Sequence, residues 1–315
     1  MRPLLLALAV LLAAAPARAE RIVFAMDWKA QPEQGGFFQA LAAGLYKARG
    51  LDVEIRSGGP GLDNQQLMAA GAVDMALGSN VFFAFNLVKA GAPIVAVMAS
   101  LQKDPQVLMA HPDDAAQTLA DLKDRPILLS DSSINTMFVW LKSTYGFNDK
   151  QIRKYTGNPA PFLVDPRGIQ QGYVSSEPFQ IQRVAGWTPK TWLLADHGYQ
   201  GYAALVLVRR DWIETKRNVV QAFVDATIEG WKQYLASDET PGDAMIRTRN
   251  PDISNELIVF AKQKMREHQI VGSGATVGTM TEARWQAMFD VAAGQGVYAR
   301  DLDWKRAFTL EFLPH

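Results

Sequence analysis

The sequence predicts an α/β protein with two lobes, each a parallel-rich sheet flanked by helices. Three observations support this fold class. Short apolar strands alternate with helical patterns from residue 21 onwards, polar or glycine-rich turns follow most strands, and the pattern changes register near residues 101–106 and again near 198–203. Such alternation is typical of parallel sheets covered by helices. Because the second unit is inserted into the first, we expect two crossovers and a ligand cleft between the lobes.

Residues 1–19 differ from the rest of the chain. Arg2 is followed by the apolar run Leu4–Ala15, and Ala17–Ala19 has the Ala-x-Ala pattern of a signal-peptide cleavage site. An uncleaved membrane anchor is the alternative, but the apolar run is shorter than the roughly 18 residues that a spanning helix needs. We therefore expect an exported protein that is cleaved after Ala19.

The composition excludes several functions. The chain has no cysteine, which excludes thiolate metal sites and cysteine nucleophiles. Without Arg2 and Arg18, 30 Lys and Arg face 32 Asp and Glu, a formal charge of −2 that offers no basic face for nucleic acid. The four histidines lack metal-ligand spacing, and no catalytic serine or zinc motif is present. We expect no enzyme activity, no metal and no cofactor.

The first unit of the mature chain centres on a polar loop. Arg21–Met26 reads as a strand and a helix begins near Gly36, which leaves residues 27–35 between them. Loops at the carboxyl ends of parallel strands are where open α/β sheets bind ligands. Trp28 could stack on a flat ring there, or it could be a core tryptophan. Asp27 could accept hydrogen bonds from a ligand, or it could cap the helix.

The remaining elements follow in order. In the first unit we expect strands at 51–56, 72–77 and 94–99 and a helix at 63–70, with residues 78–80 capping a helix that runs to residue 90. In the second unit we expect strands at 107–110, 126–129, 151–155, 171–174 and 192–194, a helix at 134–145 capped by residues 130–133, and a helix from about Asp165. A buried strand at 203–209 and helices at 216–236, 255–264 and 281–294 complete the chain. The expected division is 1–19 signal peptide, 20–104 first lobe, 105–200 second lobe and 201–315 first lobe again.

Two segments of the second lobe carry candidate side chains. Asn158 lies in the rigid stretch Tyr155–Phe162 and offers both a donor and an acceptor, although a plain surface connection is equally consistent with the pattern. Glu177 would point into the cleft if the preceding strand ends at Val174, and an exposed residue at a helix start is the alternative.

Five stretches resemble one family. They are D-W-x-x-x-P-x-x-G-G-F-F at 27–38, A-x-G-L-Y-K-A-R-G-L-D-V at 42–53, G-A-V-D-M-A-L-G-S at 71–79, Q-K-D-P-Q-V-L-M-A-H-P-D at 102–113 and G-Y-V-S-S-E-P-F at 172–179. They resemble the solute-binding proteins of ABC importers, in the branch with thiamin-pyrimidine precursor binders and the fungal pyrimidine-precursor synthase. The resemblance covers essentially the whole mature chain.

This resemblance implies a type II periplasmic binding protein, a monomer that delivers a small molecule to a permease in the inner membrane. It implies a pocket lined in the first lobe by Asp27, Trp28, Gln34, Ser79 and Asn80, and in the second by Ser132, Ser133, Asn158, Tyr173 and Glu177.

Two acidic candidates beside an indole suit a planar, donor-bearing heterocycle such as an aminopyrimidine. A sulfonate, taurine or nitrate remains the alternative, because Ser132 and Ser133 at a helix start could supply donors. A synthase-like enzyme would need the family's cysteine motif and a histidine where this chain has Glu33-Gln34. A periplasmic sensor that signals to a receptor is a third possibility.

Overall fold

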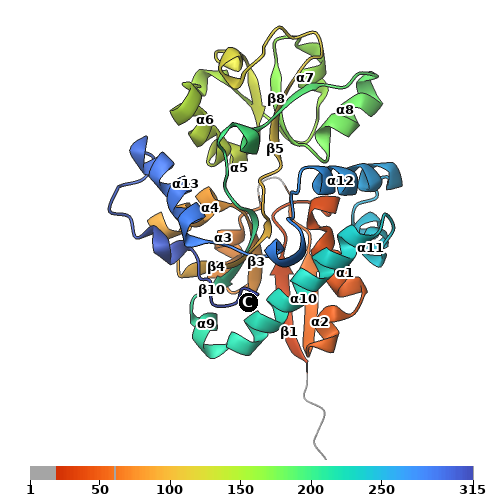
Figure 1. Cartoon of the computed structure of the whole chain (residues 1–315), viewed down its shortest axis with the longest axis vertical. Helices are drawn as coiled ribbons and strands as arrows, with labels where there is room; N and C mark the ends of the chain where they lie inside the picture. Colours follow the sequence, from red (N-terminus) through yellow and green to blue (C-terminus); the bar gives the residue numbers. More distant parts are fainter. Residues whose placement is uncertain (1–18, 60–61, 315) are drawn as a thin grey trace, which may run out of the picture.

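The structure is a computed structural model that describes residues 19–59 and 62–314. The expected signal peptide, apart from Ala19, lies outside these residues. Figure 1 shows two lobes, one above the other. Lobe one, the lower, contains the first and last parts of the chain around one sheet, and lobe two contains the middle part around a second sheet.

The sheet of lobe one has the strand order β2-β1-β3-β10-β4. Its strands are β1 (Glu20–Ala25), β2 (Leu51–Arg56), β3 (Met75–Asn80), β4 (Ile94–Leu101) and β10 (Ala203–Arg209). β1 is parallel to β2 and β3, whereas β10 is antiparallel to β3 and β4. β3 runs three residues further than the sequence predicted, so Ser79 and Asn80 end the strand itself.

The sheet of lobe two has the strand order β7-β6-β8-β5-β9. Its strands are β5 (Gln106–Ala110), β6 (Ile127–Leu129), β7 (Ile152–Lys154), β8 (Ile169–Tyr173) and β9 (Lys190–Leu193). β6 is parallel to β7 and β8, and β5 is antiparallel to β8 and β9. In both sheets the antiparallel strand, β5 or β10, is the first one after the chain enters from the other lobe. Each sheet therefore has two parallel and two antiparallel strand pairs, so both sheets are mixed and not rich in parallel pairs as expected.

The chain passes between the lobes twice. The first connection is Gln102–Pro105 and the second is 194–202, which includes the 3₁₀ turn η4 (Leu194–His197). Because both connections are short and cross beside one another between the sheets (Figure 1), they are the natural place for a hinge.

Helices cover both sheets. Lobe one has α1 (Gly35–Ala42), α2 (Leu45–Ala48), α3 (Asn64–Ala69), α4 (Val81–Lys89), α9 (Asp211–Thr215), α10 (Arg217–Ala236), α11 (Pro241–Arg249), α12 (Asn255–Glu267) and α13 (Glu282–Gly294). Lobe two has α5 (Asp131–Ile134), α6 (Met137–Tyr145), α7 (Ala160–Val164) and α8 (Glu177–Ala185). Among the described residues, no helix combines the length and apolar character needed to cross a membrane.

The prediction of a helix that starts near Asp165 is wrong. α7 ends at Val164, and Asp165 accepts a hydrogen bond from the Arg167 backbone at 2.9 Å in the turn before β8. The two prolines 159 and 161 explain the shift, because proline favours the first turn of a helix.

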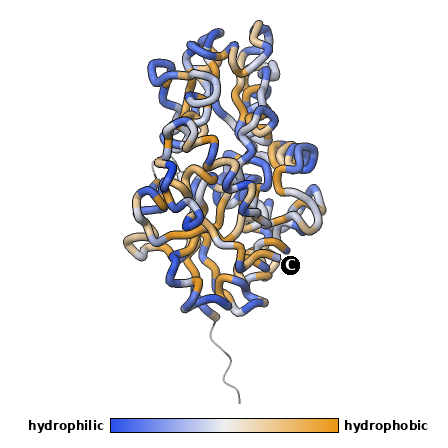
Figure 2. Tube along the Cα trace, turned by 60° about the vertical axis from the view of Figure 1, so that its left-hand side comes forward, coloured by the Kyte–Doolittle hydropathy of each residue, from blue (hydrophilic) through white to orange (hydrophobic). Residues whose placement is uncertain are grey.

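The apolar residues gather in the interior of both lobes, with hydrophilic ones at the surface (Figure 2). In lobe one, α1 packs closely on α10 because glycine removes the side chains between them. A Cβ atom on Gly36 would lie 2.2 Å from the Trp231 ring, and one on Gly35 would lie 2.1 Å from the Tyr234 ring. This packing fixes the start of α1 and with it the polar loop that precedes it.

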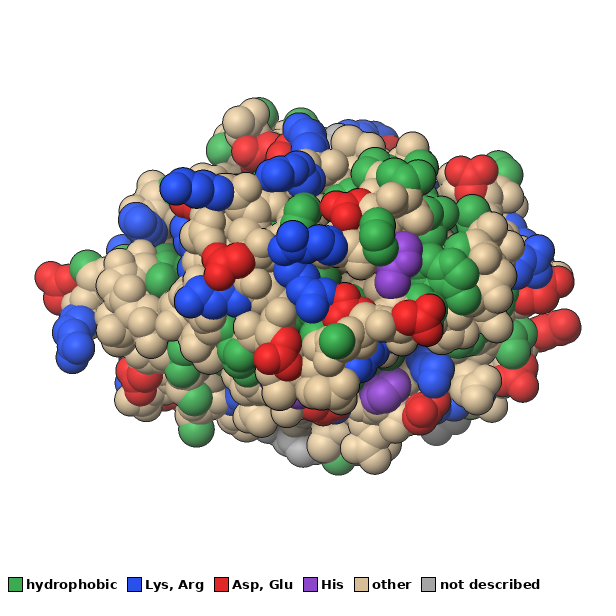
Figure 3. All heavy atoms as spheres, turned by 90° about the horizontal axis from the view of Figure 1, so that it is seen from above, with side chains coloured by type: hydrophobic (Ala, Val, Ile, Leu, Met, Phe, Trp, Pro, Cys, Tyr) green, Lys and Arg blue, Asp and Glu red, His purple; other side chains and the backbone are tan. Residues whose placement is uncertain are grey.

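Neither acidic nor basic side chains dominate the face seen from above, at the lobe-two end of the molecule. Acidic and basic side chains are interspersed there with apolar ones (Figure 3). This distribution matches the balanced composition of the chain.

Candidate functional site

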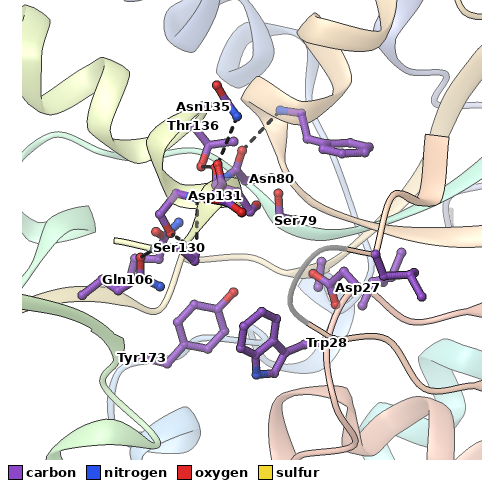
Figure 4. Close-up of a pocket in the computed structure, with 18 of the residues that line it drawn as sticks. Asp27, Trp28, Ser79, Asn80, Gln106, Ser130, Asp131, Asn135, Thr136 and Tyr173 are labelled. Carbon is purple, nitrogen blue, oxygen red and sulfur yellow. Dashed lines mark hydrogen bonds between the residues drawn. The ribbon is translucent and has the colours of Figure 1, made fainter. Parts of the chain in front are cut away.

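A cavity of about 640 Å³ lies between the lobes and is lined by residues of both. In lobe one, the segments that follow β1 and β3 line the cavity. In lobe two, it is lined by the segments that follow β6 and β8 and by the start of β5. In the view of Figure 4, Trp28 and Tyr173 lie at one end of the cavity, and Ser79, Asn80, Asn135 and Thr136 lie toward the other. Of the ten residues predicted from the sequence, nine line it: Asp27, Trp28, Gln34, Ser79, Asn80, Ser132, Ser133, Tyr173 and Glu177.

Asn158 is the exception. It is exposed, does not line the cavity, and accepts a hydrogen bond from the Ala160 backbone at 3.0 Å. Since Ala160 is the first residue of α7, the Asn158 side chain accepts a hydrogen bond at the start of that helix. Its prediction as a pocket residue is wrong, and the plain surface connection is correct.

The loop after β1 is held by its own hydrogen bonds. Gln34 donates from Nε2 to Asp27 Oδ1 at 3.3 Å and to the Trp28 carbonyl at 3.5 Å. The same carbonyl accepts from the Gly58 backbone at 2.9 Å. These bonds fix the Trp28 backbone while its half-buried indole lines the cavity, so the core-tryptophan alternative is wrong.

Glu33 is a site residue that sequence reasoning did not select. It lies in the 3₁₀ turn η1 (Pro32–Gln34), is only 2% exposed, and lines the cavity. One of its oxygens accepts a hydrogen bond from Ser175 Oγ of lobe two. The other, Oε2, is buried and has no hydrogen-bond partner among the described residues. Burial raises the pKa of this carboxyl.

Glu177 begins α8 and lines the cavity, which excludes the alternative of a fully exposed helix start. Its Oε2 accepts from the Tyr173 backbone at 2.7 Å. The pKa of Glu177 is raised to about 7, chiefly by burial and in part by the nearby charge of Glu33, although the hydrogen bond from the Tyr173 backbone lowers it. Burial also raises the pKa of Asp27 to about 6, even though the hydrogen bond from Gln34 lowers it. The pKa of the Tyr173 hydroxyl is raised well above its usual value by burial and by the surrounding carboxylates.

The opposite end of the cavity carries amides and hydroxyls. Asn80 is 1% exposed and caps α4, accepting from the backbones of Phe82 and Phe83 at 3.1 and 3.4 Å. Its Nδ2 and the Ser79 Oγ are buried without a partner among the described residues. Across the cavity, Ser130 caps α5 by accepting from the Ser133 backbone at 3.2 Å.

Two glutamines of lobe two were missed by sequence reasoning. Gln106 donates from its backbone and from Nε2 to the buried Asp104 carboxylate, at 3.0 and 3.2 Å. Because Nε2 of Gln106 is the donor in this bond, its Oε1 is left as an acceptor. Gln171 accepts from the Ser130 backbone at 2.7 Å through Oε1, which leaves its Nε2 as a donor. The sequence signal was a single polar residue at the start of the apolar strand β5, and a pair of glutamines in β8.

The charge of the cavity lining is strongly one-sided. Its acidic residues are Asp27, Glu33, Asp63, Asp131 and Glu177. Its one basic residue among those described is Lys154, which is exposed and ion-paired with Asp131 at 3.1 Å. At the end near Trp28, the carboxylates therefore face no compensating cation.

Known proteins resemble this chain in sequence profile and in fold. Residues 31–240 match the family described as NMT1/THI5 like. The alkanesulfonate-binding protein SsuA from Xanthomonas axonopodis pv. citri, solved with MOPS, has a TM-score of 0.68 at 14% identity over 94% of this chain and 99% of its own. No curated protein sequence matches significantly.

Two further structures have the same fold. The zinc-bound ligand-binding component of an ABC-type import system from Staphylococcus aureus has a TM-score of 0.64 at 13% identity, covering 89% of this chain and 93% of its own. The periplasmic nitrate-binding protein NrtA from Synechocystis PCC 6803 has a TM-score of 0.62 at 14% identity, covering 91% and 84%. Together with the profile match over two thirds of the sequence, these similarities show that the chain belongs to the NMT1/THI5-like family and has the fold of type II periplasmic binding proteins.

Proposed function

We propose that this protein is the periplasmic substrate-binding component of an ABC importer for a planar nitrogen heterocycle that bears N–H donors, as thiamin-pyrimidine precursors do. One observation carries the proposal: Asp27, Glu33 and Glu177 converge from both lobes on a cavity that also presents the Trp28 indole. The protein is exported, acts as a monomer, and passes its ligand unchanged to a permease in the inner membrane.

The chemistry of the cavity favours this ligand class. Ionised carboxylates accept hydrogen bonds and cannot donate them, so they bind ligands whose amino and ring N–H groups donate. An indole face binds a flat ring by stacking, with about 0.5–1.5 kcal/mol beyond the burial of area. Asp27 and Trp28 belong to lobe one, whereas Tyr173 and Glu177 belong to lobe two. A ligand held between them bridges the lobes and favours the closed arrangement about the two connections.

An oxyanion such as a sulfonate, taurine or nitrate is the second candidate. Its support is the opposite end of the cavity, where Asn80 Nδ2 and Ser79 Oγ have no partner among the described residues and Ser130–Ser133 begin α5. The acidic end argues against it, because an anion in this cavity is repelled by carboxylates and no lysine or arginine other than Lys154 lines the described part of the cavity.

A thermal-shift screen of the mature chain, refolded to remove bound solute, separates the two candidates. A ligand that binds only the folded state raises the melting temperature by mass action. We expect a shift with aminopyrimidines or related heterocycles. A shift with sulfonates, taurine or nitrate alone would overturn the heterocycle proposal and support the oxyanion.

A further inference from the structure

We infer that the ligand of this cavity carries a positive charge, as an ammonium or amidinium group attached to the planar ring, and that this group binds among Asp27, Glu33 and Glu177. The inference rests on the proposed function and names the charge class of its ligand. A neutral aminopyrimidine would satisfy the proposed function but not this inference.

The first support is the number of acceptors that are free at one end of the cavity. Glu33 is 2% exposed, lines the cavity, and its Oε2 has no hydrogen-bond partner among the described residues. Glu177 and Asp27 each use one oxygen, for the Tyr173 backbone and for Gln34. Gln34 Oε1 and Gln106 Oε1 add two further acceptors that line the cavity. An ammonium or amidinium group presents several donors and no acceptor, which matches this set.

The second support is the absence of compensating charge. The groups that influence the titration of these carboxyls are Gln34, Ser175 and Glu33 itself, together with backbone amides. The other titratable groups around them are Tyr155, Tyr173, Tyr234 and Asp104. Three cations lie beyond this ring of groups: Arg284 near Asp104, and Lys262 and Arg266 near Tyr234. Lys262 and Arg266 are already paired with Asp243 and Asp238, each at 2.7 Å. The lining residue Lys154 is 68% exposed at its side chain and paired with Asp131.

The third support is aromatic. The cavity is lined by Trp28, Phe83, Tyr155 and Tyr173. Tryptophan and tyrosine faces attract cations through the ring quadrupole, most strongly where the site is desolvated. A neutral ligand could stack on these aromatic rings and donate hydrogen bonds to the buried carboxylates. It would lack the attraction of a positive charge to both.

We expect the three carboxyl groups to lose protons, and so to become more negative, when a cation binds among them. Burial raises the pKa of Asp27 to about 6, that of Glu177 to about 7, and that of Glu33 above its usual value, because the charged form is disfavoured in a buried site. A bound cation favours the ionised form, so binding releases protons and strengthens as pH rises.

The test uses two isosteric probes, 4-amino-5-aminomethyl-2-methylpyrimidine, which is an ammonium ion at neutral pH, and its neutral 5-hydroxymethyl analogue. Calorimetry on the refolded mature chain at about pH 8 is expected to give at least tenfold tighter binding of the ammonium, since a charge-assisted bond replaces a neutral one. The preference shrinks at about pH 5.5. Titrations in two buffers of different ionisation enthalpy are expected to show proton release with the ammonium only.

Glu33→Gln is expected to remove most of the preference for the ammonium and to change the affinity of the hydroxymethyl analogue little. The matched control is Asp149→Asn, which removes an exposed carboxylate paired with Lys142 outside the cavity. Equal binding of the two probes, or a preference that Glu33→Gln leaves intact, would overturn the inference while the proposed function stands. Binding of neither probe, with a thermal shift from an oxyanion, would overturn both.

Discussion

At the scale of single residues, recognition depends on Trp28 and Glu177, which contribute from opposite lobes. Trp28→Ala removes a stacked aromatic face and Glu177→Gln removes a charge-assisted hydrogen bond. Each is expected to weaken binding of the heterocycle by about 1–3 kcal/mol, roughly five- to 150-fold in dissociation constant, measured by calorimetry.

Asn158→Ala is the control for this pair. Asn158 is polar, lies in the same lobe as Glu177, and does not line the cavity. It is expected to leave affinity unchanged. If Trp28→Ala also leaves affinity unchanged, the stacking role assigned to the indole is wrong.

Asp104, together with the buried Asp27 and Glu177, is expected to make the stability of the protein depend on pH, because burial raises the pKa of all three carboxyls. Asp104 is fully buried, and burial raises its pKa from 3.8 to about 7. Between those two values the unfolded chain releases the proton while the folded protein keeps it, so stability falls as pH rises through that window. Asp104→Asn is expected to reduce the fall in melting temperature between about pH 5 and pH 8.

The control is the exposed Asp149→Asn, which should leave the pH dependence as it is. An equally steep fall in Asp104→Asn would show that another group is responsible.

His268 titrates in the opposite sense, because burial lowers its pKa and acid conditions therefore destabilise its folded environment.

At the scale of elements, the packing of α1 on α10 positions the Trp28 loop. Gly36→Ala places a Cβ atom 2.2 Å from the Trp231 ring, which is itself fully buried and cannot move freely. Urea unfolding is expected to show a loss of about 1–3 kcal/mol, as in other overpacked cores.

Gly294→Ala is the matched substitution, because no atom lies within 4 Å of its added Cβ atom and the residue ends α13. It is expected to be neutral or to stabilise by about 0.5–1 kcal/mol, since alanine restricts the unfolded chain. Equal effects at the two glycines would contradict the close packing of the two helices.

The elements also show what a sequence can and cannot reveal. β2 was predicted at its observed bounds because hydrophobic and polar residues alternate there, and Asn80 was predicted as part of a cap because a short polar residue precedes an apolar helix. Glu33 was missed because its role depends on Ser175, 142 residues later in the chain. Gln106 was missed because its orientation is set by a buried carboxylate in the connection between lobes. Local patterns predict elements, whereas the role of Glu33 arises from a contact between lobes and that of Gln106 from a side-chain hydrogen bond that the pattern does not reveal.

At the scale of the whole molecule, the hydrogen bond from Ser175 Oγ to Glu33 joins lobe two to lobe one directly beside the cavity. Ser175→Ala removes it and leaves the buried carboxylate with one partner fewer. The closed arrangement is expected to lose population, so the radius of gyration of the unliganded protein rises in X-ray scattering and ligand affinity falls about three- to tenfold.

Ser143→Ala is the control, because the Ser143 hydroxyl donates only to the Trp140 carbonyl within lobe two, at 2.8 Å. Its scattering curve should match the original protein. Identical scattering from Ser175→Ala would mean that the bond between lobes does not influence their separation.

The central claim is that the cavity selects a donor-bearing heterocycle over an oxyanion. Calorimetric titration of the refolded mature chain with a 4-aminopyrimidine and, separately, with an alkanesulfonate tests it most directly. We predict saturable binding of the aminopyrimidine that Glu177→Gln weakens, and no heat of binding from the sulfonate. Saturable binding of the sulfonate alone would contradict the account and would assign recognition to Ser79, Asn80 and the serines of α5 instead.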